Sequence, residues 1–121
     1  KVILDAFLQS LAWQELPKGV RLLPVFVPDF TDAQADARES LFRWVNDRGG
    51  VLIAGAPVSE PDFSDDPHND SHQWSPSAMA RVGYHKNLII AHALAVKADY
   101  LFFADADLIL DRTTVASLLA R

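Results

Sequence analysis

The positions of apolar residues along the chain predict alternating helices and strands. Within residues 2–15, four apolar side chains recur at helical spacing and form one stripe. They are Leu4, Phe7, Leu8 and Leu11. Pro17 and Gly19 are expected to end this helix. The run "VRLLPVFV" at 20–27 is typical of a strand, although Pro24 removes one donor from the ladder.

A second helix and a second strand follow the same pattern. Thr31 or Asp32 can cap a helix that reaches about Asp47. Its inner stripe is expected to contain Ala37, Leu41 and Val45. Gly49 and Gly50 are expected to end this helix as C-cap residues. The short apolar run "VLIAG" at 51–55 then predicts another strand.

Residues 57–74 interrupt this alternation. They are rich in Pro, Asp and Ser and show no period, which is typical of a functional or mobile loop. We therefore expect 60–73 to be the most mobile internal segment. Its stretch "HNDSH" at 68–72 offers nitrogen and oxygen ligands, but an irregular loop provides no fixed scaffold for a metal.

The last third of the chain predicts a helix, a strand and a final helix. Ser75 and Pro76 are a cap residue followed by proline, which starts a helix that reaches about Lys97. Its expected apolar side contains Met79, Val82, Ile89, Ile90, Ala93 and Leu94. The continuous apolar run "YLFFA" at 100–104 fits a central strand. Asp111 or Thr113 can cap the final helix.

This order of elements predicts an α/β fold with a parallel sheet covered by helices on both faces. The chain has 121 residues, half of them hydrophobic, which suffices for one domain with a real core. Its net charge of −5 argues against a nucleic-acid partner. It contains no cysteine and no apolar stretch near the roughly 18–20 residues of a membrane span. We expect a cytoplasmic protein.

Two carboxylates follow the last apolar run. Asp105 and Asp107 stand one residue apart at the carboxyl end of the predicted strand, where open α/β sheets bind their ligands. If the extended form persists, both side chains point the same way. A divalent cation then relieves their repulsion, and oxygen ligands suit Mg²⁺ or Mn²⁺. The alternative is that both aspartates form turn and cap hydrogen bonds before the final helix.

Three segments resemble GT-A fold glycosyltransferases, most closely the family 2 type. The segment from Phe7 to Asp32, "FLQSLAWQELPKGVRLLPVFVPDFTD", is similar to the family's opening helix, Q-x-x-P turn, second strand and acidic turn. "MARVGYHKNLIIAHAL" at 79–94 is similar to its "ARN" helix, with Lys86-Asn87 in place of Arg-Asn. "ADYLFFADADLILDRTTVASLL" at 98–119 is similar to the strand and helix around its D-x-D motif.

This resemblance implies the nucleotide-sugar-binding half of a metal-dependent glycosyltransferase that transfers a sugar to an acceptor hydroxyl. It implies that Asp105 contacts the ribose or the metal, and that Asp107 binds the Mn²⁺ or Mg²⁺ that bridges the diphosphate. Lys86 would approach the base or diphosphate, and Asp29 would hold the base. The implied partners are a UDP- or GDP-sugar and a saccharide, lipid or protein acceptor.

Two departures from the family keep alternatives open. The family begins with a strand that supports the nucleotide, whereas this sequence opens on the expected first helix. Inverting members carry a carboxylate general base after the D-x-D motif, so we expect that residue beyond Arg121 and regard the chain as a partial domain. A non-catalytic nucleotide-sugar-binding module is the alternative. A haloacid-dehalogenase-type phosphatase fits less well, because Leu108-Ile109 follow the D-x-D and its strand comes late.

Overall fold

The structure is a computed structural model that describes residues 1–55 and 76–121. The loop predicted at 57–74 lies outside the described residues. The same holds for the "HNDSH" stretch and for the segment 60–73 that we expect to be most mobile. The described chain forms two compact units. The first contains residues 1–52 and 102–121, and the second contains residues 53–101.

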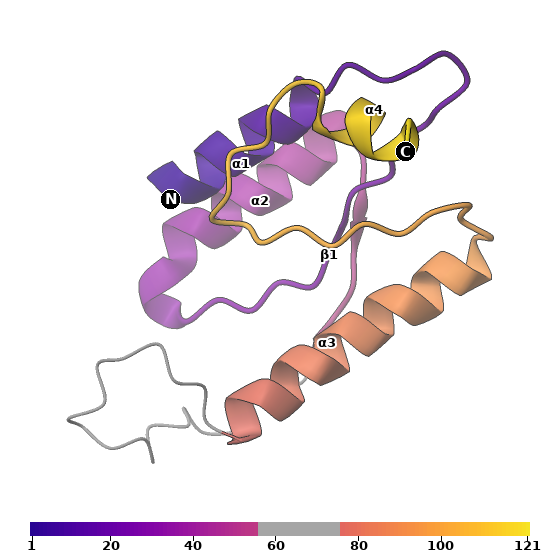
Figure 1. The fold of residues 1–121 in the computed structure, drawn as a ribbon. Coiled ribbons are helices and arrows are strands. Elements are labelled where there is room, and N and C mark those ends of the chain that lie inside the picture. Colours follow the sequence, from indigo (N-terminus) through magenta and orange to yellow (C-terminus); the bar gives the residue numbers. More distant parts are fainter. Residues whose placement is uncertain (56–75) are drawn as a thin grey trace. The chain divides into compact units, whose positions relative to one another are not determined.

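Two helices pack against each other in the first unit (Figure 1). Helix α1 spans Val2–Ala12, and α2 spans Ala35–Arg48 after a short 3₁₀ turn, η1, at Asp32–Gln34. Thr31 precedes this turn, and its backbone N–H donates to Gln34 Oε1 at 3.0 Å. That bond satisfies one backbone donor at the start of the helical segment. The predicted second helix is confirmed, but its N-cap residue is Gln34, and Thr31 is the N-cap residue of the preceding turn η1.

The hydrophobic core of this unit lies where α1 meets α2. Phe7, Leu8 and Leu41 are buried and form its centre, which we call the core cluster. Partly buried side chains from both helices, from the chain around β1 and from the C-terminal segment surround it: Leu4, Leu11, Phe26, Phe30, Trp44, Val45, Ala104 and Leu110. The helical stripes expected from the sequence therefore do face the core.

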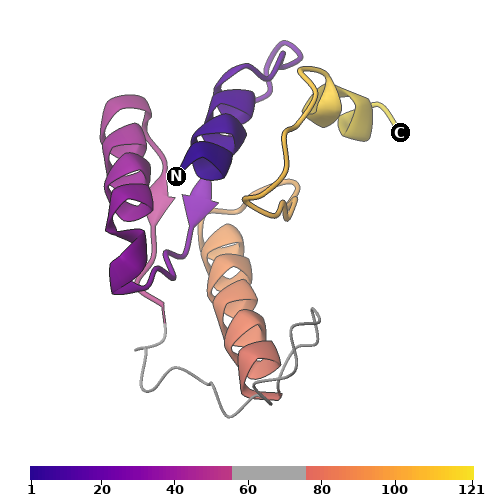
Figure 2. The same cartoon turned by 90° about the vertical axis from the view of Figure 1, so that its left-hand side faces the viewer.

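The sheet of the described chain has two very short strands. Strand β1, Val25–Phe26, pairs in parallel with β2, Val51–Leu52, and Figure 2 shows them side by side. Val51 also donates its N–H to the carbonyl of Pro24 at 2.9 Å. Both strands fall within the predicted runs 20–27 and 51–55, but each run contributes two residues to the ladder. The ring of Phe26 meets that of Trp44 edge-on, with centroids 5.8 Å apart.

The prediction of a central strand at 100–104 is wrong. This segment has no regular secondary structure, and the described sheet contains β1 and β2 alone. Tyr100 is 79% exposed, and Leu101, Phe102 and Phe103 are also exposed, whereas Ala104 packs on the core cluster. An apolar run marks side chains that can be buried, but a strand also needs a neighbouring edge that pairs with its backbone.

The second unit consists mainly of α3, Pro76–Ala95. The helix starts at the predicted proline, and the chain leaves it through Lys97, whose φ of 57° is left-handed. Of the predicted apolar side, Val82, Ile89 and Ala93 are half-buried, whereas Met79, Ile90 and Leu94 are exposed. In the part of the chain that the structure describes, no helix combines the length and apolar character needed to cross a membrane.

The observed architecture is a mixed one of helices with a two-stranded parallel sheet. The final helix, α4, spans Thr114–Leu119 with Thr113 as its N-cap residue, as the sequence indicates. This architecture is compatible with an α/β fold in its coarse form. The larger parallel sheet covered on both faces stays a prediction.

Shortening a core leucine should destabilise the first unit strongly. Leu41 is 3% exposed, so Leu41→Ala should lower the free energy of unfolding by about 2–5 kcal/mol through lost burial and a cavity. Leu118→Ala is the matched control, because Leu118 on α4 is 45% exposed and should cost at most about 1 kcal/mol. Urea unfolding measures both variants. Equal losses would contradict the assignment of the core.

The backbone that joins α2 to β2 should require glycine at residue 50. Gly50 has a φ of +127°, and a Cβ there would lie 3.1 Å from the carbonyl oxygen of Pro24. Gly49 has a φ of +88° but open space around it. Gly49→Ala should lower the free energy of unfolding by backbone strain alone, about 1–3 kcal/mol. Gly50→Ala should lower it further, because the close contact with Pro24 adds to that strain. Thermal unfolding of both variants tests this order, and the reverse order would contradict it.

Candidate functional site

Asp105 and Asp107 lie on a turn. The backbone N–H of Leu108 donates to the carbonyl of Asp105 at 3.2 Å, and the chain turns at residues 106 and 107. Both aspartates are exposed. The expectation that an extended strand points both side chains the same way is therefore wrong for this segment. The turn places the two carboxylates on one short exposed loop instead.

The ends of this loop are held by the core. Ala104 and Leu110 both pack against the core cluster, so residues 105–109 bridge two anchored positions. Asp105 directly follows one anchor. The carboxylates are therefore presented to solvent from a segment whose ends are fixed to the packed part of the unit.

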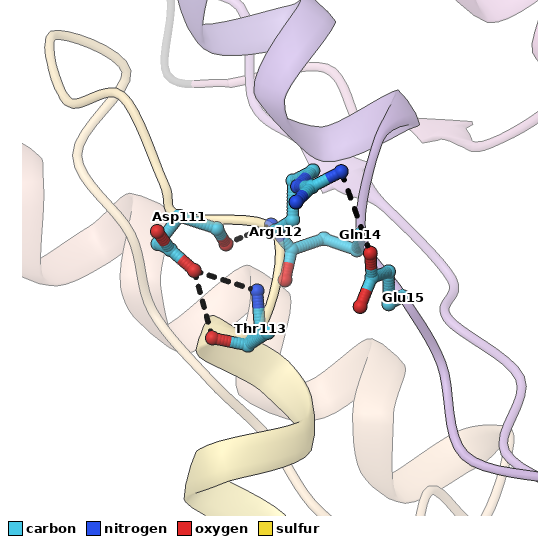
Figure 3. Close-up of polar contacts among 5 residues, drawn as sticks. All are labelled: Gln14, Glu15, Asp111, Arg112 and Thr113. Atoms are coloured by element: carbon cyan, nitrogen blue, oxygen red, sulfur yellow. Dashed lines mark hydrogen bonds and ion pairs between the residues drawn. The ribbon is translucent and has the colours of Figure 1, made fainter.

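The side-chain hydrogen bonds before α4 belong to a third aspartate. Asp111 Oδ1 accepts from the backbone N–H of Thr113 at 2.9 Å and from its hydroxyl at 2.7 Å (Figure 3). The backbone bond, followed by the hydroxyl bond, lowers the pKa of Asp111. By contrast, neither Asp105 nor Asp107 makes a side-chain hydrogen bond or ion pair to any residue within 1–55 or 76–121. The turn-and-cap alternative thus fits Asp111 better than the D-x-D pair.

One glutamine joins the end of α1 to the start of α4. Gln14 Nε2 donates to the carbonyl of Ser10 at 3.1 Å and to that of Asp111 at 2.7 Å. Its Oε1 accepts from the backbone N–H of Val115 at 3.1 Å. The half-buried amide therefore satisfies a carbonyl in the last turn of α1 and an N–H in the first turn of α4, groups that helix ends leave unpaired.

Glu15, the next residue, adds to these contacts. We call the contacts of Gln14 and Glu15 with residues 111–115 the junction. The backbone N–H of Glu15 donates to the carbonyl of Arg112 at 2.8 Å. Their side chains form an ion pair at 3.6 Å, which Figure 3 shows beside the Asp111 and Thr113 contacts. Both side chains of the pair are largely exposed, so solvent screens it and its contribution is small. The backbone bond and the Gln14 amide carry most of the junction.

The other predicted site residues lie on different elements. Asp29 is exposed and precedes Phe30, which packs on the same core cluster as Ala104. Lys86 is exposed on α3, in the second unit. His68, Asn69, Asp70 and His72 lie outside the described residues.

The turn offers too few oxygen ligands to hold a divalent cation by itself. Within residues 1–55 and 76–121, no group of three or more His, Asp or Glu side chains is arranged to hold an ion. Asp105 and Asp107 could supply two oxygen ligands, whereas Mg²⁺ requires about six. Waters and phosphate oxygens would have to provide the others. The residues therefore fit a cation that is shared with a phosphorylated ligand better than a permanent metal site.

Comparison with known proteins does not extend this description. Protein-family models, curated proteins and solved structures were compared with the chain, and none of them matches.

Gln14 is the residue that the sequence analysis did not single out. It lies in the segment "QELP" at 14–17, the Q-x-x-P turn of the family resemblance, and that resemblance assigned it no role. A polar residue just after an amphipathic helix is the signal that could have suggested a cap. Its partners are 97 and 101 residues away along the chain, which no local pattern reveals.

Stability should depend on the charge of Asp111 at acid pH. Its lowered pKa in the folded protein means that the unfolded chain binds more protons, so stability rises with pH in this range. The contribution is present at neutral pH and is lost as pH falls below about 4, through the folded pKa. Asp111→Asn should therefore be less stable than wild type at pH 7, with a difference that shrinks toward acid pH.

Thr113→Val provides a graded comparison for this prediction. It removes the hydroxyl donor to Asp111 but retains the backbone donor, so its effect should have the same sign and a smaller size. The melting temperatures of all three proteins are measured between pH 2 and 7. This range spans the ordinary carboxyl pKa of about 4. A difference between wild type and Asp111→Asn that stays constant with pH would refute the charge effect.

Proposed function

We propose that this chain is the nucleotide-sugar-binding part of a metal-dependent glycosyltransferase. The observation that supports this most directly is the D-x-D turn. Two exposed carboxylates lie on a loop with anchored ends and are not engaged by other described side chains, while Asp111 accepts the two hydrogen bonds from Thr113 before α4. Such an arrangement leaves both carboxylates available for a ligand.

A divalent cation is the ligand class that suits this pair. Two carboxylates on one short loop carry like charges, and a cation bound to both offsets their repulsion. Oxygen ligands are preferred by Mg²⁺ and Mn²⁺. The net charge of the chain, −5, also favours a cation over a free anion. A nucleoside diphosphate would then bind through the metal, although the protein itself is acidic.

In this proposal the residues of the chain bind and orient the donor sugar nucleotide. Asp107 holds the cation, and Asp105 contributes either to the cation or to the ribose. The bound cation would stabilise negative charge on the leaving diphosphate. Asp29 is proposed to contact the base, and Lys86 the base or the diphosphate. The general base that activates the acceptor hydroxyl is not assigned to any residue of this chain.

Removing one carboxylate should abolish metal-dependent nucleotide binding without unfolding the protein. Asp107→Asn should bind neither UDP nor GDP in a Mn²⁺-dependent manner, and Asp105→Asn should bind more weakly than wild type. Asp47→Asn is the matched control, because it removes the same charge from an exposed position on α2. Isothermal titration calorimetry with and without Mn²⁺ measures binding, and circular dichroism checks the fold.

Two results would contradict the proposed function. One is a wild-type protein that binds neither nucleotide in the presence of Mn²⁺. The other is nucleotide binding that is equally strong in wild type and Asp107→Asn. Either result would favour the simpler interpretation, in which Asp105 and Asp107 end an apolar segment where the chain returns to water.

A further inference from the structure

The loop that carries the two aspartates is held from outside by the junction around Gln14. Leu110 ends the loop on the core cluster, and Asp111 and Arg112 follow at once. Asp111 accepts from the Gln14 side chain at 2.7 Å, and Arg112 accepts from the Glu15 backbone at 2.8 Å. The exit of the loop is therefore fixed by packing and by two hydrogen bonds, whereas its entry is fixed by the packing of Ala104.

Gln14 is chemically suited to this task because its amide has a donor and an acceptor at the same end. Its Nε2 donates to the carbonyls of Ser10 and Asp111, and its Oε1 accepts from the N–H of Val115. A glutamate would retain the acceptor and lose the donor. A methionine has a similar length and lacks both functions at its end. The two roles of the amide can therefore be separated by substitution.

We propose that Gln14 is a positioning residue for the D-x-D turn, and that it acts on Asp105 and Asp107 through Asp111. This inference rests on the proposed function for its consequence in binding, but its structural part can be tested without metal. A flexible loop must be ordered at the moment of binding, which weakens affinity. Partners that orient metal ligands typically change metal affinity by about 10–100-fold when they are mutated.

Amide hydrogen exchange in the metal-free protein tests the structural part. Leu108 reports on the turn through its bond to Asp105, Val115 on the acceptor of Gln14, and Val51 on the separate sheet. In Gln14→Met, exchange at Leu108 and Val115 should accelerate about tenfold, the equivalent of one lost hydrogen bond, while Val51 stays unchanged. In Gln14→Glu, Val115 should stay protected and Leu108 should not. Gln9→Met, at an exposed position on α1, is the control and should change none of the three.

Two exchange results would overturn the proposal. Unchanged exchange at Leu108 in both Gln14 variants would show that the turn does not depend on the junction. Equal acceleration at Leu108 and Val51 would make Gln14 a general stability residue rather than a positioning one. The comparison of Met with Glu keeps the test decisive if the methionine variant is poorly folded, because the glutamate retains the cap of α4.

Calorimetry of UDP binding with Mn²⁺ tests the functional part. Gln14→Glu should bind about tenfold more weakly than wild type, and Gln9→Glu should bind as wild type does. Unchanged affinity in Gln14→Glu, with the turn loosened in the exchange experiment, would overturn the positioning role. If wild type shows no Mn²⁺-dependent binding, the proposed function fails, and the exchange data still decide whether Gln14 holds the turn.

Discussion

The side-chain amide of Gln14 is the interaction on which the placement of the C-terminal segment of the first unit depends. Its Nε2 donates to the carbonyl of Ser10 at the end of α1 and to the carbonyl of Asp111. Its Oε1 accepts from the N–H of Val115. These partners come from opposite ends of the chain. Without the junction, the C-terminal segment would be held mainly by the partial burial of Ala104 and Leu110. A short helix such as α4 is marginal by itself, so its position depends on such external contacts.

The small size of the core explains why these polar contacts matter. Phe7, Leu8 and Leu41 form its centre, and the surrounding side chains are partly exposed. Each buried leucine contributes a few kcal/mol at most, about 1.5–3 by burial alone. The sheet adds two short strands, and Gly50, just before β2, has a positive φ. Hydrogen bonds at helix ends are therefore a large share of what fixes the loops, including the loop that carries the two aspartates.

Sequence periodicity predicted the helices well and the sheet poorly. The stripe of Phe7 and Leu8 and that of Ala37 and Leu41 identified which faces of α1 and α2 are buried, because helical spacing is a local property. The prediction of a strand at 100–104 was wrong, because strand pairing depends on a partner that is distant in sequence. Apolar character does not specify that partner. For the candidate site, the sequence singled out Asp105 and Asp107 and indicated that Asp111 or Thr113 precedes the final helix as a cap. It could not show the turn at Asp105–Leu108 or the contacts of Gln14, since both depend on how remote segments meet.

The central claim is that the D-x-D turn binds a divalent cation together with a nucleoside diphosphate. The most direct measurement is nuclear magnetic resonance of the ¹⁵N-labelled protein with UDP and small additions of Mn²⁺, whose unpaired electrons broaden the signals of nearby amides. The account predicts that the amides of residues 104–108 broaden first, that this selectivity requires UDP, and that Mg²⁺ in excess reverses it. Broadening that is spread evenly over exposed acidic residues, or that is centred away from the turn, would contradict the account.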